Sequence, residues 1–273
     1  MKGRVLIVAG SDSGGGAGIQ ADIKAVTALG AFAMTAVTAL TAQNTEGVEG
    51  VFPVPPAFIR EQMGVVIADI GVDAVKTGML HDAAVIEAVA EELSLRLPGI
   101  PLVVDPVMVA KGGHRLLEES AVDALTRLLL PLASVITPNI PEAEALSGAA
   151  ILDVIDMRRV AEALLAKGAK AVLLKGGHLS GERVTDLLAT PEGIEAFEAP
   201  RIETRHTHGT GCTLASALAA GLAQGMSLRE AVVRARHYVL LAMASAPGYG
   251  RGHGPLDHAV TVDPARVAAL SRG

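Results

Sequence analysis

The sequence of 273 residues contains a single cysteine, no tryptophan and few charged side chains. Because Cys212 has no second cysteine to pair with, a disulfide scaffold is excluded and a reducing compartment is indicated. Charged residues make up 19% of the chain and the net charge is −6, without any long run of Lys or Arg. This mild acidity argues against a nucleic-acid-binding protein, which usually carries a basic stripe. Since 50% of the residues are apolar, a disordered chain is excluded as well.

The sequence also lacks a convincing membrane span. No charged residue lies between Lys24 and Glu46, and this stretch is long enough to cross a bilayer. Ala and Thr dominate it, however, and Gly30 interrupts it, so it predicts a helix that ends near Gly30 and a buried strand at residues 34–42. The apolar run at residues 5–9 is shorter than that of a signal peptide. We therefore expect a soluble, cytoplasmic protein.

What the sequence does contain is an alternation of short β-branched runs and longer helical patterns. This alternation predicts an α/β three-layer sandwich with a mostly parallel central sheet flanked by helices, as one domain over residues 1–273. A turn signal at residues 190–193 predicts an antiparallel hairpin at one sheet edge. The expected strands lie at residues 5–9, 34–42, 73–76, 101–105, 134–137, 171–175, 184–188 and 194–197. The expected helices lie at residues 19–29, 56–70, 83–97, 121–130, 156–167, 213–224 and 228–244, with a last one beginning at Asp263.

Glycine and polar residues follow most of the expected strands, although the chain as a whole is apolar. Ligands of parallel sheets bind beyond the carboxyl ends of the strands, so these residues are candidates for a binding site. The segments are at residues 10–12, 43–45, 77–79, 105–108, 138–139 and 176–178.

A glycine-rich loop at residues 10–18 joins the first expected strand to the first helix. Glycines allow close backbone approach and let amides point toward a ligand. The loop lacks the Gly-Lys-Ser/Thr of a Walker motif, and no acidic residue follows at residues 25–45 to bind a ribose. A ligand-binding loop and a plain turn both remain open interpretations.

A second glycine-rich turn, at residues 206–212, leads directly into an Ala/Leu-rich helix. Unpaired amides at a helix N-terminus form an anion hole suited to a phosphoryl group. Cys212 would lie there, where the helix dipole lowers the pKa of a thiol; the alternative is a small buried apolar residue. We interpret His206 and His208 as loop residues, because no cluster of zinc ligands accompanies them.

Two further groups of residues suit phosphate chemistry. Asn139 and Glu142 project from one side of a first helical turn and could bind Mg²⁺; an ordinary acidic helix start is the alternative. Asp105 could join the same metal shell. Lys175 ends an apolar strand at this edge, where a lysine is costly to bury unless it faces an anion such as phosphate.

Seven of these motifs together resemble the hydroxymethylpyrimidine/phosphomethylpyrimidine kinases of thiamine biosynthesis, members of the ribokinase-like superfamily. The order and spacing of the motifs make the match specific, and a glycine-rich tail at residues 248–255 also fits. The motifs are AGSDSGGGAGIQAD (9–22), AQNT (42–45), KTGM (76–79), DPVM (105–108), TPN (137–139), KGGH (175–178) and HGTGC (208–212).

The resemblance implies phosphorylation of 4-amino-5-hydroxymethyl-2-methylpyrimidine by ATP with Mg²⁺, first to the monophosphate and then to the diphosphate. It implies that Gln43 pairs with the pyrimidine edge, that Asp22 and Gly10 lie near it, and that Met79 and Val107 pack against the ring. An amide suits this role because it offers both a donor and an acceptor. With 2% aromatic residues, an aromatic sandwich around the ring is not expected.

The remaining residues are implied to serve phosphate transfer. Asn139 and Glu142 match the superfamily's magnesium motif, with Asp105 as a second metal-binding carboxylate. ATP would contact Lys175, Asn139 and Thr210. The implied catalytic residues are Lys175, Gly209, Thr210, Gly211 and Cys212. Sugar kinases of the superfamily have aspartate in place of Cys212; if the cysteine replaces that base, its loss should slow the first phosphorylation more than the second.

Two other functions remain open. A pyridoxal kinase shares the fold and the Gly-Thr-Gly-Cys turn, although Gln43 and Met79 favour a small aminopyrimidine. A non-catalytic pyrimidine sensor would keep the pocket, but Lys175 and the anion-hole turn argue for catalysis. A homodimer is expected from the resemblance.

Overall fold

A nine-stranded mixed sheet forms the centre of the computed structural model, which describes residues 2–109, 113, 116–117 and 119–265. The strands are β1 (Arg4–Asp12), β2 (Phe32–Gln43), β3 (Val48–Pro53), β4 (Ala74–Thr77), β5 (Leu102–Val104), β6 (Val135–Ile136), β7 (Val172–Leu174), β8 (Arg183–Thr190) and β9 (Gly193–Pro200). Their order is β3-β2-β1-β4-β5-β6-β7-β8-β9. The strands from β2 to β7 in this order pair in parallel, whereas β3, β8 and β9 pair antiparallel at the two edges.

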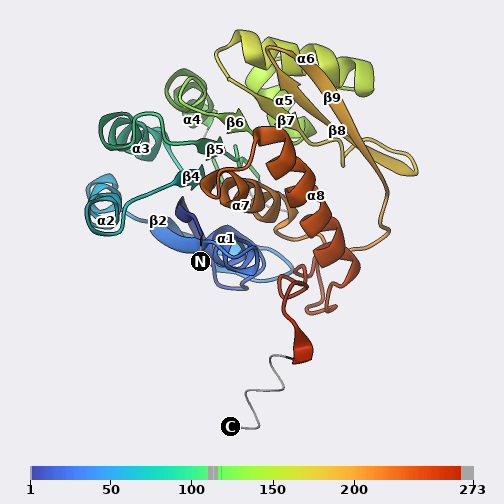
Figure 1. The fold of residues 1–273 in the computed structure, drawn as a ribbon, viewed down its shortest axis with the longest axis horizontal. Helices are drawn as coiled ribbons and strands as arrows, with labels where there is room; N and C mark the ends of the chain where they lie inside the picture. The colour runs from blue at the N-terminus through green and yellow to red at the C-terminus, as the bar shows by residue number, and fades with distance from the viewer. Residues whose placement is uncertain (1, 110–112, 114–115, 118, 266–273) are drawn as a thin grey trace.

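Helices cover both faces of the sheet, which confirms the predicted three-layer sandwich (Figure 1). One face packs against α1 (Gly18–Ala28), α7 (Thr210–Ala223) and α8 (Leu228–Ala244). The other face packs against α2 (Pro56–Asp69), α3 (Ala83–Arg96), α4 (Glu119–Ala124), α5 (Ile140–Ser147) and α6 (Val154–Ala166). Within the described residues, no helix is long and apolar enough to span a membrane.

The apolar run of β1 explains why both faces are covered. Leu6 and Val8 belong to the core under α2 and α3, whereas Val5 and Ile7 belong to the core under α1 and α7. A strand that alternates in this way needs apolar residues at every position, because both of its faces are buried. The uncharged stretch after Lys24 behaves as predicted: α1 ends there, Gly30 adopts a φ of +81°, and β2 follows.

Besides α5, of which only the first turn was expected, the predicted elements differ from the observed ones at three places. The edge strand β3 was not expected, because its Gly50 and Pro53 disfavour interior strands but are tolerated at an edge. The helix predicted at residues 121–130 is α4 followed by a π-helical segment, η1 (Leu125–Leu129). The helix predicted from Asp263 onward falls largely outside the described residues, which end at residue 265.

The path of the chain places a binding site at the carboxyl end of β1. The chain passes from β1 to β2 through α1 on one face, and from β3 to β4 through α2 on the other. The winding direction therefore changes between β1 and β4, which are parallel neighbours. Ligands of doubly wound sheets bind at such switch points.

Candidate active site

One cavity of about 1500 Å³ opens along the carboxyl ends of the parallel strands. Small-molecule pockets commonly measure ~300–1,000 Å³, so this cavity has room for two ligands side by side. It contains most of the residues that the sequence singled out, brought together from strands that are distant in the chain. These are Gly10, Gln43, Met79, Asp105, Val107, Asn139, Glu142, Lys175, Gly209, Thr210, Gly211 and Cys212.

One end of the cavity has an apolar floor. Ala39, Met79 and Leu116 form a small buried cluster of their own, with Val107 packed against it. Gly10 approaches this floor so closely that a Cβ atom there would come within 3.0 Å of the Met79 sulfur. Aliphatic and thioether groups thus make an apolar surface against which a small ring could pack.

Gln43 also lines the cavity and has polar side chains as neighbours. Its side chain contacts Thr41 Oγ1 at 3.1 Å and His208 Nε2 at 3.2 Å. His208 lies in a loop, as expected, but it is buried and its Nε2 atom lies 2.9 Å from Asp12 Oδ2. Within the described parts of the chain, no three His, Cys, Asp or Glu side chains gather into a metal site, so neither His206 nor His208 belongs to one.

The amides of the first glycine-rich loop are bound by the protein itself. The carboxylate of Asp12 accepts hydrogen bonds from the amides of Gly14, Gly16 and Ala17, at 2.8, 3.1 and 2.7 Å. Although burial opposes its charge, the contact with His208 and these amides lower the pKa of Asp12. The plain-turn interpretation therefore describes these three amides better than an anion-binding loop does.

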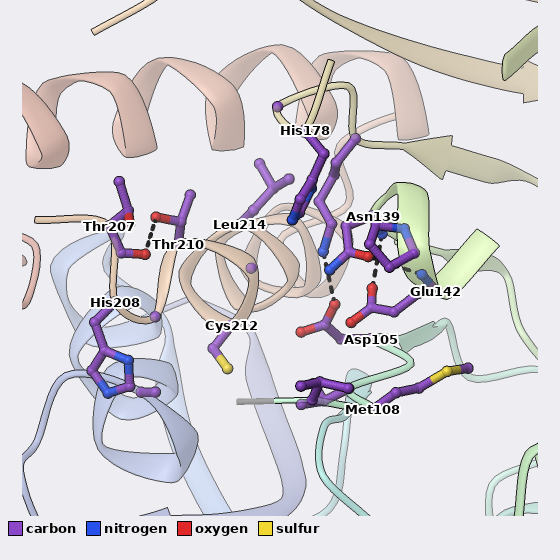
Figure 2. Close-up of a pocket in the computed structure, with 18 of the residues that line it drawn as sticks. Asp105, Met108, Asn139, Glu142, His178, Thr207, His208, Thr210, Cys212 and Leu214 are labelled. Carbon is purple, nitrogen blue, oxygen red and sulfur yellow. Dashed lines mark hydrogen bonds and ion pairs between the residues drawn. The ribbon is translucent and has the colours of Figure 1, made fainter. Parts of the chain in front are cut away.

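The second glycine-rich turn differs at its helix start, although the amides of residues 206, 207, 208 and 210 also have partners within the protein. α7 begins at Thr210, and no side chain caps the helix. Gly209 has a φ of +79°, and a Cβ atom there would lie 1.8 Å from the Gly16 carbonyl oxygen, so the two loops fit together only with glycine. The N–H groups of Gly211 and Cys212 lie in the first helical turn, where helix geometry provides no partner. The hydroxyl of Thr210 donates to the Thr207 carbonyl oxygen at 2.7 Å and stabilises the turn (Figure 2).

Cys212 lies at this turn with its side chain directed into the space between His208 and Asp105 (Figure 2). Burial raises the pKa of its thiol to about 12, against the opposing effect of nearby Lys76. The expectation of a thiol acidified by the helix dipole is therefore wrong, because desolvation of the thiolate outweighs the favourable charges. The sulfur accepts a hydrogen bond from the backbone amide of Gly18.

Asp22 does not line the cavity. It is fully buried and lies 2.9 Å from the Lys76 ammonium group, and it also accepts a hydrogen bond from Ser216 at 2.7 Å. Burial opposes the charge of Lys76, but Asp22 raises the pKa of this lysine above its ordinary value. Asp22 therefore lies behind the cavity wall, which the side chain of Lys76 reaches, and its place near the pyrimidine stays a prediction.

Asn139 and Glu142 form a capping box at the start of α5. The Asn139 side chain accepts from the Glu142 amide at 3.0 Å, and the Glu142 carboxylate accepts from the Asn139 amide at 2.8 Å. Burial, together with the charge of Asp105 and against that of Lys175, raises the pKa of Glu142 to about 7. The helix-start interpretation is thus correct for their hydrogen bonds, and both residues still face the cavity.

Lys175 and Asp105 form an ion pair that lines the cavity. The Lys175 ammonium group lies 3.2 Å from Asp105 Oδ1, which also accepts a hydrogen bond from Thr137 at 2.9 Å. Gly211 lies directly beside this pair, because a Cβ atom there would be 3.2 Å from the Lys175 nitrogen. A cation and the first-turn amides therefore converge on one point, where an anion would be held.

Mg²⁺ suits the acidic side of this arrangement. The two buried carboxylates, Asp105 and Glu142, lie close enough for one to raise the pKa of the other, and a divalent cation would relieve that repulsion. Mg²⁺ usually takes one or two carboxylates and completes its shell with water and substrate phosphates. The absence of a larger ligand cluster within the described ranges is compatible with this mode of binding.

No sequence motif points to the far end of the cavity. Its wall comes from the end of β9, the segment after it, and one side of α8, where Arg236 pairs with Asp186 at 2.8 Å. These residues resemble ordinary core and surface positions, and only their meeting in space reveals a second subsite. The wall includes Pro200, Ile202, Arg236, Val239, Leu240 and Met243.

A family model and sequence relatives agree on one family, and the similar solved structures include pyridoxal kinases. A family model described as phosphomethylpyrimidine kinase matches residues 12–257. A hydroxymethylpyrimidine/phosphomethylpyrimidine kinase of Streptomyces coelicolor is 51% identical over 254 residues, which cover 93% of each chain. The thiamine biosynthesis bifunctional protein ThiED of Geobacter sulfurreducens is 53% identical over 97% of this chain, which spans 54% of that longer protein. The pyridoxal kinase of Bacillus subtilis, solved as an ADP complex, has a TM-score of 0.88 at 38% identity, covering 95% of this chain and 98% of that one.

Proposed function

The chain belongs to the phosphomethylpyrimidine kinase family, and we propose that it phosphorylates 4-amino-5-hydroxymethyl-2-methylpyrimidine and then its monophosphate with ATP, in thiamine diphosphate biosynthesis. It is a kinase of ribokinase-like fold that uses ATP. The observation that carries the substrate proposal is a single cavity in which an apolar floor, rimmed by Gln43, adjoins the convergence of Lys175 and the first turn of α7.

Charge neutralisation and positioning carry the reaction. The acceptor oxygen attacks the γ-phosphorus of ATP, and the bond from that phosphorus to the bridging oxygen of ADP breaks. Phosphoryl transfer has a loose transition state whose charge is spread over the equatorial oxygens. Lys175 and the amides of Gly211 and Cys212 would donate to these oxygens. Because burial keeps the Cys212 thiol protonated before transfer, the proton of the attacking hydroxyl would pass to an oxygen of the transferred phosphate as the new bond forms.

Asp105 and Glu142 would hold Mg²⁺, and Asn139, Thr210 and Lys175 would contact the nucleotide. When bound, the ion supplies positive charge beside the phosphates. Lys175 already pairs with Asp105, so it can move toward a phosphate oxygen over a short distance. The second subsite, along α8 and the end of β9, has room for the adenosine part of ATP.

The direct test is a product assay with the purified chain, ATP, Mg²⁺ and the hydroxymethylpyrimidine. Successive appearance of the monophosphate and diphosphate, followed by chromatography and ³¹P NMR, is the expected result. Tight binding of the pyrimidine without product would identify a sensor. Lys175→Met serves as the control for contaminating kinases, since it removes the cation beside the transferred group.

Pyridoxal is the second candidate acceptor. The fold similarity to a pyridoxal kinase extends over nearly the whole chain, so that compound belongs in the same assay. A higher kcat/KM for pyridoxal than for the pyrimidine would favour this alternative. The apolar floor and the amide of Gln43 support the pyrimidine.

We further propose that residues 1–273 act as one domain, in the cytoplasm and as a homodimer. Exposed apolar side chains on the edge strand β3 and its neighbour β2 support association: Leu40 of β2 is paired with Phe52 of β3, and the two are 49% and 68% exposed. Light scattering of the purified chain, with Phe52→Ser as the comparison, tests the homodimer.

A further inference from the structure

We propose that His208, held in place by Asp12, fixes the orientation of the Gln43 side-chain amide and thereby selects an aminopyrimidine over pyridoxal. His208 is then a positioning residue that determines specificity without contacting the transferred phosphate. The inference rests on the proposed function, because it explains how the same cavity would distinguish the two candidate acceptors.

His208 is fixed on all sides. Only 7% of the residue is exposed, and its Nε2 atom lies 2.9 Å from Asp12 Oδ2 and 3.2 Å from Gln43 Nε2. Its backbone amide donates to the Gly254 carbonyl oxygen at 3.2 Å. Its ring lies so close to Gly16 that a Cβ atom there would come within 2.5 Å. The contact with Asp12 and the burial of the residue hold the ring beside Gln43.

The available hydrogen atoms decide which of these contacts can coexist. A carboxylate only accepts, so His208 Nε2 must carry a hydrogen and donate it to Asp12. A nitrogen that carries a hydrogen cannot accept one from Gln43 Nε2, which also only donates. On the other side of the amide, Thr41 has one hydroxyl hydrogen but two acceptors, the Ser11 carbonyl oxygen at 2.9 Å and Gln43 Oε1 at 3.1 Å.

A half-turn of the Gln43 amide removes both conflicts. The Gln43 oxygen then accepts a hydrogen bond from the His208 Nε2–H group, which also donates to Asp12. The Gln43 nitrogen donates to Thr41 Oγ1, and the Thr41 hydroxyl continues to donate to the Ser11 carbonyl oxygen. The nitrogen and oxygen of an amide have nearly the same shape, so the hydrogen-bond network assigns them. The residues around Gln43 therefore favour the orientation with its carbonyl oxygen toward His208.

This orientation matters because the two acceptors present opposite patterns. Beside its hydroxymethyl group the aminopyrimidine has an amino donor and then a ring-nitrogen acceptor. At the corresponding positions pyridoxal has an aldehyde oxygen, which accepts, and then a hydroxyl, which can donate. One lone pair and one N–H of Gln43 remain for a paired contact, as in the recognition of adenine by glutamine. A fixed amide matches one of these two patterns and leaves the other unpaired, which is how polar sites reject analogues.

The test compares His208→Leu, which removes the N–H, with His208→Gln, which keeps an N–H at a similar reach. The matched control is His237→Leu, a substitution on the exposed side of α8. For each variant, kcat and KM are measured with both compounds at saturating ATP. We expect His208→Leu to lower the ratio of kcat/KM for the pyrimidine to that for pyridoxal by about tenfold, since one paired hydrogen bond is lost. The change should fall on KM for the pyrimidine and leave KM for ATP unaltered.

In His208→Gln we expect the ratio to return to within about threefold of the unsubstituted value, and His237→Leu should not change it. Equal losses on both compounds in His208→Leu, or the same ratio in His208→Gln and His208→Leu, would overturn the inference. If His208→Leu does not fold, Thr41→Val removes the other partner of the amide and must lower the same ratio. An unsubstituted protein that phosphorylates neither compound refutes the proposed function itself; an active protein with an unchanged ratio in the variants refutes this inference alone.

Discussion

Two glycine-rich loops meet at the cavity. They differ in whether a carboxylate of the protein accepts hydrogen bonds from their backbone amides. The first loop, residues 10–18, closes around Asp12. The carboxylate of Asp12 accepts hydrogen bonds from three backbone amides of this loop. The second loop, residues 206–212, leads into α7 without any side-chain cap. Glycine content alone therefore does not identify an anion site. Whether a loop can bind an anion depends on whether its amides already donate hydrogen bonds to a carboxylate of the protein.

The largest expected effect comes from separating the two loops at their contact. Gly209→Ala would place a Cβ atom 1.8 Å from the Gly16 carbonyl oxygen, at a residue whose φ is +79°. Overpacking and a left-handed alanine together should cost at least about 3 kcal/mol of unfolding free energy. Urea unfolding of the purified variant measures this loss.

The matched control is Gly99→Ala, which has the same φ of +79° but open space around the new methyl group. It should lose only the conformational part, about 1 kcal/mol. Equal losses in the two variants would show that the loops do not depend on their close contact.

The second loop can be changed with little effect on the fold. Gly211→Ala brings a Cβ atom within 3.2 Å of the Lys175 ammonium group, which can shift because it is the end of a flexible side chain. Displacing a donor from the site of charge development should lower kcat about 100-fold. The unfolding midpoint should change little, as in Gly50→Ala, whose new methyl group meets nothing closer than 3.9 Å. A variant of full activity would place the transferred phosphate elsewhere.

The first loop should respond to acid, because its central carboxylate is ionised. The folded-state pKa of Asp12 lies below its unfolded value, so its stabilising effect is complete above the unfolded value and is lost as pH falls through the folded one. Asp12→Asn should cost about 2 kcal/mol at neutral pH, and the gap to the unsubstituted protein should narrow on acidification. Asp69→Asn, at an exposed carboxylate, should show neither effect. A gap that does not depend on pH would contradict the role of the charge.

The sequence predicts the layers well because continuous apolar runs and helix signals are local. The strand at residues 5–9 and the helix beginning after Ser227 follow from their own residues, and both are observed. The edge strand β3 is missed because it is stabilised by pairing with β2, and its Gly50 and Pro53 indicate a loop. Pairing with a distant partner overrides what the segment itself favours.

The same limit applies to the site. Sequence motifs place Asp22 beside the substrate residues but contain no information about depth, and the chain buries it against Lys76 and Ser216. Asn139 and Glu142 fit two interpretations equally, because a capping box and a metal motif use the same two residue types at the same spacing. The histidine that contacts Gln43 comes from 165 residues further along the chain, and only the fold brings the two together.

The smallest expected effect tests what Cys212 adds to the second loop beyond its amide. Burial raises the pKa of the thiol to about 12, which disfavours the thiolate that a general base at this position would need. Cys212→Ser keeps the amide and an acceptor for the Gly18 N–H, and we now expect it to slow both phosphorylations by a similar factor of less than about tenfold. Cys212→Ala also loses that acceptor and should be somewhat slower. Both steps can be followed in one time course of mono- and diphosphate. A much larger loss on the first step, whose acceptor is a neutral hydroxyl, would restore the cysteine as a base; equal losses would show that the anion hole acts through its backbone.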